Sequence, residues 1–256
     1  MHIILTGATG LVGSGVLHAM IQNSAISKIS VLSRRPVPML QEIKDDRINV
    51  VLAEDFTKFD NKVLDQLNGA TGCVWAMGVS QNDVNKEDYT RITKTMTLYA
   101  AQAFKSLASP SETFKFVYVS GEGATHEPGF TTPIFGRVKG ETEIALAKIE
   151  EESPRFQAIS VRPAMVDSGA HDEIKPWVPQ LGAFKRVTYA GLSPVIRCFW
   201  PGMHSPTKPL GAFLTGVATG EFDGKLTGSG VDMVGNSPII NNIAFRRLMA
   251  LDTSKK

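Results

Sequence analysis

Three glycines near the start of the chain have the spacing of a phosphate-binding turn. Gly7, Gly10 and Gly13 stand in the order G-x-x-G-x-x-G, between the apolar run 2–7 and a helical apolar pattern over 10–24. In such a strand-to-helix turn the first glycine permits a tight bend. The second lets a pyrophosphate approach the backbone, and the third lets helix and strand pack closely.

The helix that follows this turn would add unpaired N–H groups and a partial positive charge at its N-terminus, both of which favour phosphate. A glycine-rich turn that binds nothing is the alternative. We predict a dinucleotide site whose first contacts are Gly7, Thr9, Gly10, Leu11, Val12 and Gly13.

Two arginines after the second predicted strand indicate which of the two dinucleotides, NADP(H) or NAD(H), would bind. An acidic residue at this position would accept hydrogen bonds from the adenosine ribose hydroxyl. The chain carries Ser33, Arg34 and Arg35 instead. Guanidinium groups suit a 2′-phosphate, because each can form paired, charge-assisted hydrogen bonds. The sequence favours NADP(H) over NAD(H), with a solvated arginine pair as the alternative.

A carboxylate after the third predicted strand is a weaker signal for the same cofactor. Asp55 and Phe56 follow the apolar run 48–53. At that place a carboxylate could accept a hydrogen bond from the adenine amino group. An acidic surface loop is an equally good interpretation, so these residues are candidates for cofactor binding and no more.

Strands and helices alternate along the first part of the chain, and this alternation positions the turns. Near-continuous Val and Ile runs separated by helix-length segments are typical of a parallel sheet that is covered on both faces. The predicted strands are 2–7, 28–34, 48–53, 72–78, 114–123 and 155–166, and the predicted helices are 10–24, 60–69, 85–109 and 136–152. This order predicts an α/β fold with a doubly wound parallel sheet, the Rossmann fold, as a single domain over 1–256.

The regular pattern breaks after Val166. Prolines and aromatic residues dominate 167–209, which we predict to be a small irregular cap on the substrate side, with a short helix packed on the sheet within 189–203. The pattern then predicts a helix over 207–220 and a hairpin or strand over 224–235. A closing helix is expected over 237–250, capped by Ser237 with Pro238 at its first position.

Several motifs in this order resemble the short-chain dehydrogenase/reductase superfamily. They are "TGATGLVG", "SRRP", "EDF", "VYVSGEGA", "KGETE" and "VRPAMV". The chain is most similar to the atypical, extended branch that includes the Tat-interacting protein and its fungal relatives. The resemblance covers nearly the whole chain, is strongest over 2–166, and implies an NAD(P)-binding Rossmann-fold protein.

The resemblance also implies catalytic residues. The family uses a Tyr as general acid/base, a Lys that lowers the Tyr pKa and holds the nicotinamide ribose, and a Ser that orients the substrate oxygen. Ser120 matches the Ser and Lys139 matches the Lys, but Phe135 stands at the Tyr position. A phenyl ring has no proton to donate, and general acid catalysis contributes about 10²–10⁴-fold. Tyr118 and His126 are the candidate substitutes.

Further positions follow from the same resemblance. Pro163, Ala164 and Met165 match the segment that lies against the nicotinamide, and Met77 and Gly78 match the loop on the adenosine side. Thr93 falls where relatives often carry an Asn that supports proton transfer. The helices 85–109 and 136–152 form the usual dimer face in relatives, so a homodimer is possible.

Three functions are compatible with these residues. The first is an NADP(H)-dependent oxidoreductase acting on a small, fairly apolar organic substrate. The second is an isomerase, cyclase or dehydratase that keeps the scaffold without net redox chemistry. The third is a protein that binds NADP(H) as a sensor and acts through a protein partner. The sequence favours the first.

Composition excludes other classes of protein. The chain has 256 residues, a hydrophobic fraction of 43% and a formal net charge of +2, which argues against nucleic-acid binding. Its two cysteines, Cys73 and Cys198, suggest neither a disulfide framework nor a metal site. No signal peptide and no apolar run long enough to span a membrane is recognisable, so a cytoplasmic protein is expected.

Overall fold

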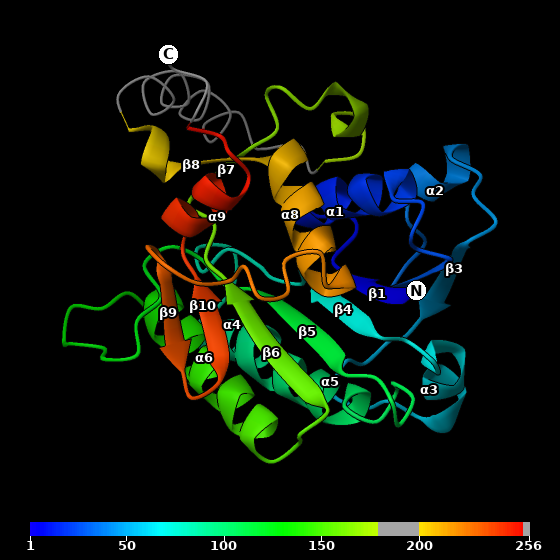
Figure 1. Ribbon diagram of the computed structural model, residues 1–256, viewed down its shortest axis with the longest axis horizontal. Helices are drawn as coiled ribbons and strands as arrows, with labels where there is room; N and C mark the ends of the chain where they lie inside the picture. Colours follow the sequence, from blue (N-terminus) through cyan, green and yellow to red (C-terminus); the bar gives the residue numbers. More distant parts are fainter. Residues whose placement is uncertain (179–199, 253–256) are drawn as a thin grey trace.

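The computed structural model describes residues 1–178 and 200–252. Its centre is an eight-stranded sheet with the order β3-β2-β1-β4-β5-β6-β10-β9 (Figure 1). β9 pairs antiparallel with β10, and the other neighbours pair parallel. The strands are β1 (His2–Thr6), β2 (Lys28–Ser33), β3 (Ile48–Leu52), β4 (Gly72–Trp75), β5 (Phe114–Val119), β6 (Phe156–Val161), β9 (Val231–Val234) and β10 (Ser237–Ile240).

The strand order reverses direction between β1 and β4. The chain builds outward from β1 to β3, returns to β4 on the other side of β1, and continues to β6. In open α/β sheets, ligands bind outside the carboxyl ends of the strands at this reversal point. The predicted doubly wound sheet is therefore confirmed, and its reversal point is where a search for a ligand site should begin.

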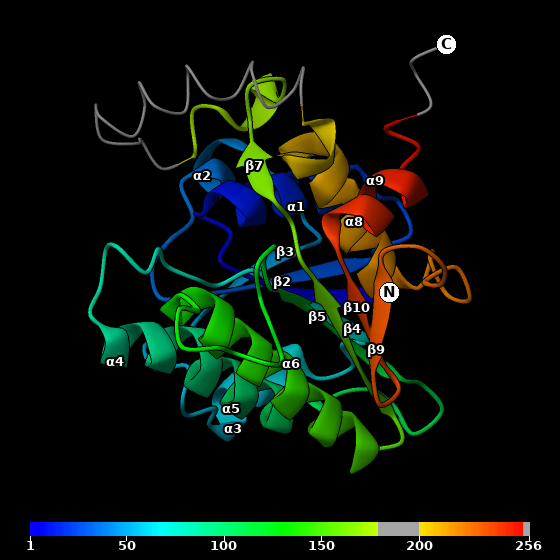
Figure 2. The same ribbon diagram turned by 90° about the vertical axis from the view of Figure 1, so that its left-hand side faces the viewer.

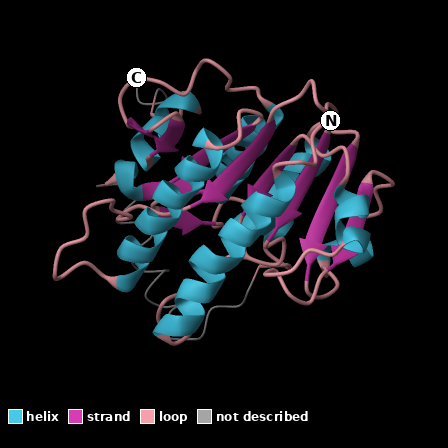
Figure 3. Cartoon of the chain, turned by 90° about the horizontal axis from the view of Figure 1, so that it is seen from below, coloured by secondary structure: helices cyan, strands magenta, loops and turns pink. Residues whose placement is uncertain are grey.

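Helices cover both faces of the sheet (Figure 2). One face carries α1 (Leu11–Gln22), α2 (Met39–Glu42) and α8 (Thr207–Thr219), of which α1 and α8 pack against each other. The opposite face carries α3 (Asn61–Leu67), α4 (Lys86–Thr90), α5 (Met96–Phe104) and α6 (Ile134–Glu151). Figure 3 shows the long helices running alongside the strands.

The core lies on both sides of the sheet, which explains why the strands read as continuous apolar runs. Beneath α1 and α8 it is mainly aliphatic. Beneath α5 and α6 it is rich in aromatic rings, with Trp75 stacked on Phe116 at 5.8 Å and Phe114 stacked on Phe156 at 6.2 Å. Cys73 is buried in this second cluster, as its apolar surroundings predict.

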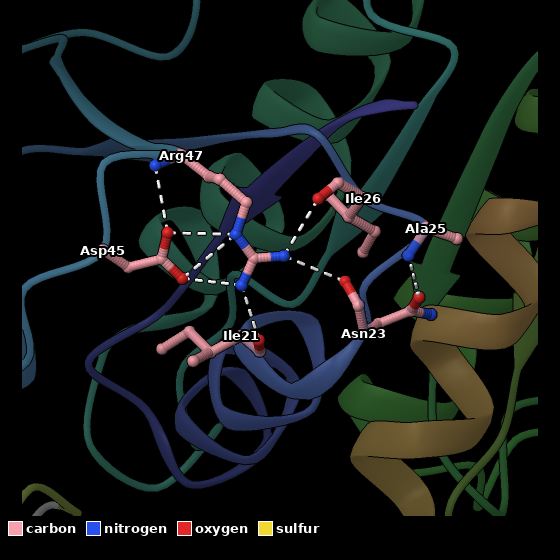
Figure 4. Close-up of polar contacts among 6 residues, drawn as sticks. All are labelled: Ile21, Asn23, Ala25, Ile26, Asp45 and Arg47. Carbon is pink, nitrogen blue, oxygen red and sulfur yellow. Dashed lines mark hydrogen bonds and ion pairs between the residues drawn. The ribbon is translucent and has the colours of Figure 1, made fainter.

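The C-terminal end of α1 is closed by one arginine (Figure 4). Arg47 donates to the carbonyl oxygens of Ile21 at 2.6 Å, Asn23 at 3.0 Å and Ile26 at 2.9 Å. The same guanidinium binds the Asp45 carboxylate and thereby lowers the pKa of that carboxyl. Carbonyls at a helix end have no partner within the helix, so Arg47 satisfies groups that would otherwise need water.

The helix predicted over 85–109 is interrupted. α4 and α5 are joined by a π-helical turn, Arg91–Thr95, and α5 ends at Phe104. A π-helical turn inserts an extra residue into the helix and is frequent at functional sites. Thr93, at the centre of this turn, is 4% exposed.

The prediction of a closing helix from Ser237 is wrong. Ser237–Ile240 forms β10, fully buried between β6 and β9, and the helix α9 (Asn242–Leu248) begins later. Asn241 caps it, accepting hydrogen bonds from the N–H groups of Ile243 and Ala244. β10 pairs with β6 through Ile239 and Ile240. Pro238 precedes these residues, so its missing N–H does not interrupt the pairing with β6.

The predicted irregular cap is partly regular within the residues that the structure describes. β7 (Met165–Asp167) and β8 (His204–Pro206) form a separate two-stranded parallel sheet, flanked by 3₁₀ turns at Asp172–Ile174 and Pro201–Met203. Cys198 and most of the short helix predicted within 189–203 lie outside the described residues. Over 1–178 and 200–252, no helix combines the length and apolarity that a membrane span requires.

Candidate functional site

A cavity of about 840 Å³ opens at the carboxyl ends of the central strands. It is lined by residues from several separate parts of the chain, which the fold brings to the point where the strand order reverses. The lining consists of 10–12, 76–80, 118–123 and 163–166, with Thr93, Phe135, Lys139 and Met203. The cavity thus joins the glycine turn to the predicted catalytic residues.

The glycine turn is sterically specific. Gly7 has φ +71°, and a Cβ added to it would lie 2.3 Å from the carbonyl oxygen of Ala76. A Cβ added to Gly13 would lie 2.0 Å from the carbonyl oxygen of Gly7. Both positions therefore require glycine, as the spacing predicts. α1 begins directly after Gly10 without a side-chain cap, so the first N–H groups of this helix have no partner within it.

The residues predicted to bind the adenosine half of the cofactor lie in different environments. Arg34 and Arg35 are exposed at the carboxyl end of β2, and neither belongs to the cavity lining. Asp55 accepts hydrogen bonds from the backbone N–H and the hydroxyl of Thr57, and these bonds lower its pKa. Phe56 is 2% exposed, with its ring 5.9 Å from that of Trp75. Its ring is thus part of the core, and only its backbone could contact a nucleotide.

Lys139 lies one turn into α6 and reaches the cavity wall. Its Nζ donates to the carbonyl oxygens of Ser120 at 2.5 Å and Val119 at 3.4 Å. Burial lowers the pKa of this ammonium to about 8, and the charge of Glu143 acts in the opposite direction. Lys139 is therefore a cation held by the end of β5, with a pKa close to neutrality.

Ser120 belongs to the cavity lining and carries an unpaired, buried hydroxyl. The residue is 3% exposed, and its Oγ has no hydrogen-bond partner among the described residues. Buried polar groups in proteins are nearly always paired. A buried hydroxyl that lines a cavity without a partner is suited to bind a ligand atom.

Phe135 lines the same cavity with a ring that carries no polar atom. Its backbone N–H donates to the side-chain oxygen of Gln81 at 3.1 Å, which connects the start of α6 to the loop after β4. The tip of the ring lies against Gly123, where an added Cβ would be 3.1 Å from Cζ. The place that the resemblance gives to an acid is thus occupied by a packed aromatic ring.

The two candidate substitutes have different environments. Tyr118 lines the cavity but is 1% exposed, and burial, followed by the charge of Glu143, raises its pKa well above the usual value. His126 does not line the cavity. Its Nε2 lies 2.6 Å from Oε2 of Glu143 and 3.1 Å from Nη2 of Arg162. The structure therefore does not bring His126 to the predicted site.

A buried ion pair behind Lys139 was not predicted. Glu143 is 0% exposed and accepts hydrogen bonds from Arg162 at 2.5 and 2.9 Å. With His126 it ties together α6, the end of β6 and the loop after β5. The sequence contains both charges in the motifs "KGETE" and "VRPAMV", but nothing in their spacing shows that they meet.

The segment predicted to lie against a nicotinamide is anchored from the small sheet. Pro163, Ala164 and Met165 line the cavity, as do Met77, Gly78 and Thr93. The N–H of Ala164 donates to Oγ of Ser205 at 2.9 Å, and that hydroxyl donates to Oδ1 of Asn242 at 2.6 Å. β8 and α9 therefore hold one wall of the cavity in place.

Comparison with known proteins finds fungal relatives. No protein-family model matches the chain. It is 48% identical over 157 residues to botcinic acid biosynthesis cluster B protein 16 of Botryotinia fuckeliana, which covers 61% of this chain and 99% of that protein. It is 34% identical over 220 residues to leucinostatins biosynthesis cluster protein T of Purpureocillium lilacinum, covering 77% of each. More distantly, it is 23% identical to the mitochondrial protein fmp52 of Emericella nidulans, over 68% of this chain and 70% of that protein.

Solved structures share the fold at low sequence identity. A short-chain type dehydrogenase/reductase from Mycobacterium ulcerans matches with a TM-score of 0.63 at 15% identity, over 95% of this chain and 89% of the other. The Bordetella bronchiseptica enzyme WbmF, solved in complex with NAD⁺, matches with a TM-score of 0.63 at 13% identity, over 99% and 79%. Both matches extend over nearly the whole sheet and its helices.

Proposed function

Because this chain belongs to the short-chain dehydrogenase/reductase superfamily, we propose that it is an NADP(H)-dependent oxidoreductase acting on a small, fairly apolar organic molecule. One observation carries the proposal. A single cavity joins the glycine turn at α1 to the unpaired hydroxyl of Ser120 and the ammonium of Lys139. Phosphate binding and the handling of a reacting group are thus combined in one space.

The residues present fit a nicotinamide dinucleotide. The free N–H groups at the start of α1 would hold the pyrophosphate, and Arg34 and Arg35 would hold the 2′-phosphate. Lys139 would hold the nicotinamide ribose, and 163–165 would lie against the ring. When bound, the nicotinamide would supply or accept a hydride. That WbmF was solved with NAD⁺ supports this class of cofactor.

The side chains of this protein would bind and orient the substrate. Ser120 is placed to donate a hydrogen bond to a substrate heteroatom, because its hydroxyl is buried in the cavity wall and otherwise unpaired. Met165, Met203 and Phe135 would exclude water around the rest of the substrate. Two relatives carry names from fungal biosynthesis clusters, which supports an intermediate of small-molecule biosynthesis as the substrate.

Calorimetry tests the proposal. Purified protein is titrated with NADPH and with NADH, alongside the double variant Arg34→Ala/Arg35→Ala. We expect NADPH to bind in the micromolar range, NADH to bind more weakly, and the double variant to lose the difference. The matched control is Lys148→Ala/Arg155→Ala, which removes the same charge from exposed positions near the end of α6 and the start of β6.

Each outcome has a distinct meaning. Equal affinity for both nucleotides, unchanged in the double variant, would contradict the preference for NADP(H) and leave a dinucleotide site. Absence of binding would contradict the oxidoreductase. Substrate turnover that does not depend on the redox state of the nucleotide would favour an isomerase, cyclase or dehydratase on this scaffold, a reaction class that Phe135 is compatible with.

Location and assembly are further proposals. The location we propose is the cytosol, whereas the more distant fmp52 relatives are named as mitochondrial. A homodimer through α5 and α6 would follow the pattern of the superfamily. These two helices pack against each other, and Tyr99 of α5 is 55% exposed. Cell fractionation and light scattering would test both.

A further inference from the structure

We propose that the substrate reduced in this cavity is an iminium ion, a carbon–nitrogen cation, rather than a ketone or an aldehyde. The inference rests on the proposed function, because it takes the reduced nicotinamide as the source of hydride. Two independent features of the cavity lead to it. One is the phenyl ring of Phe135 at the position of the usual proton donor, and the other is a carboxylate beside that ring.

Among the residues that the structure describes, the place of the usual acid at the reactive end of the cavity holds a ring without a proton to donate. Reduction of a carbonyl adds a hydride to carbon and a proton to oxygen, and Phe135 has no proton to give. Tyr118 is 1% exposed and its pKa is raised by burial. The ammonium of Lys139 donates two of its three protons to backbone carbonyl oxygens, at 2.5 and 3.4 Å, and the third would be taken by the nicotinamide ribose.

An iminium ion does not require that proton. Its carbon accepts the hydride, and the π electron pair of the C=N bond becomes the lone pair of nitrogen. The positive charge is discharged, the product is a neutral amine, and NADPH becomes NADP⁺. Two electrons and one hydrogen nucleus are transferred, and no acid is consumed. The reaction therefore matches a site that keeps its cofactor residues but carries a phenyl ring where the acid would stand.

Glu122 gives the cavity a charge suited to a cation. Among the described residues that line the cavity, Glu122 is the one carboxylate and Lys139 is the one ammonium. Its Oε2 accepts one long hydrogen bond, at 3.4 Å, from the backbone N–H of Asn242. The nearby guanidinium of Arg162 donates its short hydrogen bonds to Glu143, at 2.5 and 2.9 Å. The Glu122 carboxylate thus keeps capacity for a ligand.

The aromatic ring of Phe135 also favours a cationic ligand. Gly123 follows Glu122 and lies against the Phe135 ring, so the carboxylate and the ring belong to neighbouring parts of one wall. A cation over the face of this ring would be attracted to it, and more strongly when water is excluded. Met165 and Met203 provide apolar surface for the remainder of the molecule. The wall that Glu122 and Phe135 form is thus complementary to a positive charge on an apolar body.

A matched substrate pair tests the reaction. The protein and NADPH are mixed either with N-methyl-dihydroisoquinolinium, a permanent iminium ion, or with tetralone, a ketone of the same bicyclic size. NADPH absorbance is followed, and the uncatalysed rate is subtracted for each compound. We expect the rate enhancement for the iminium ion to exceed that for the ketone by at least about 10²-fold, the lower range of what an acid contributes.

A binding measurement tests the recognition of charge without turnover. The protein loaded with NADP⁺ is titrated with N-methylisoquinolinium and with neutral isoquinoline near neutral pH. We expect the cation to bind about 10-fold more tightly, and Glu122→Gln to abolish this preference. Glu127→Gln is the matched control, because Glu127 is exposed in the same loop and does not line the cavity.

The outcomes separate this inference from the proposed function. If NADPH binds but tetralone is reduced as well as the iminium ion, or neither is reduced, or the cation shows no preference that depends on Glu122, the iminium assignment is wrong. The oxidoreductase is then judged by cofactor binding alone. If NADPH does not bind, the proposed function fails first.

Discussion

At the glycine turn the backbone leaves no space for an added Cβ atom. At the opposite end of the same cavity, Phe135 lacks the hydroxyl group that a tyrosine would carry there. A Cβ on Gly13 would lie 2.0 Å from a backbone oxygen, so that end is fixed by contacts between helix and strand. At the other end Phe135 packs against Gly123, while Ser120 and Lys139 keep positions suited to a reacting ligand. Cofactor binding and proton transfer are therefore separable demands in this fold. In our proposal this chain meets the first demand without the usual group for the second.

The largest effect is expected at the phosphate end. Gly13→Ala must push α1 away from β1, since the contact is with backbone that cannot rotate away. We expect a loss of about 3 kcal/mol in the free energy of unfolding, as for severe overpacking, and loss of NADPH binding. Urea unfolding and calorimetry measure the two effects. Gly202→Ala is the control, because a Cβ there meets no atom of the described residues within 4 Å. Unchanged NADPH binding in Gly13→Ala would contradict the turn geometry.

Replacing Lys139 should weaken the cofactor without weakening the fold. Lys139→Met removes a buried ammonium that is costly to desolvate, so the free energy of unfolding should not fall. NADPH affinity should fall about 10–100-fold, the range expected for a hydrogen bond to a charged group. Lys148→Met, in the exposed last turn of the same helix, is the control. An equal effect of the two variants on NADPH binding would show that Lys139 does not contact the cofactor.

The pH dependence of binding should report the same lysine. Below a pH of about 8 Lys139 is charged, and above it the ammonium loses its proton, so NADPH affinity should fall as the pH rises through about 8. Because the charge of Glu143 raises this pKa, Glu143→Gln should move the midpoint to lower pH. Glu141→Gln, which breaks a surface pair with Lys94, should leave it in place. A midpoint that does not respond to Glu143→Gln would contradict the coupling.

The contribution of Lys139 to the free energy of unfolding should rise with pH, whereas NADPH affinity should fall. The pKa of Lys139 is lowered in the folded state from 10.5 to about 8, so the unfolded chain binds more protons between these values. The contribution of this group to the free energy of unfolding therefore rises with pH over that interval. Lys139→Met should lack the rise, which urea unfolding at a series of pH values would detect.

The smallest effect is expected at Ser120. Ser120→Ala removes a hydroxyl that has no partner among the described residues, so the free energy of unfolding should change little. Turnover of a substrate that accepts a hydrogen bond should fall about 10-fold. Ser30→Ala is the contrast, because Ser30 is buried and bonded to His2 at 2.8 Å, and its loss should cost about 1–3 kcal/mol. A larger loss of stability for Ser120→Ala than for Ser30→Ala would show that the hydroxyl is structural.

Local sequence patterns specified the strands from β1 to β6, because strands buried on both faces of a parallel sheet are necessarily continuous apolar runs. The same reasoning failed at Ser237, where an apparent helix cap is a strand residue. Pairing with β6 and β9 there outweighs the local signal. The π-helical turn around Thr93 and the pairing of β7 with β8 likewise depend on contacts that no local pattern encodes.

In the candidate site, too, some residues could be predicted from the sequence and others could not. The glycine turn could be predicted from spacing, and Ser120 and Lys139 from the resemblance to a superfamily. The partners of those residues could not. Glu143 and Arg162 meet only because α6 crosses the end of β6, and Glu122 becomes a cavity residue only because its loop folds against Phe135. His126 shows the converse, since a loop histidine close in sequence to the site lies outside the cavity.

The most direct test of the account is Phe135→Tyr, measured for NADPH binding and for ketone reduction. Phe130→Tyr, at a fully exposed ring outside the cavity, is the control. We expect NADPH affinity to stay within about twofold, while kcat/KM for the ketone rises by about 10²–10⁴, the contribution of a general acid. A variant that binds NADPH as the wild type does but gains no ketone reduction would contradict the claim that this cavity keeps its cofactor site and lacks only the acid.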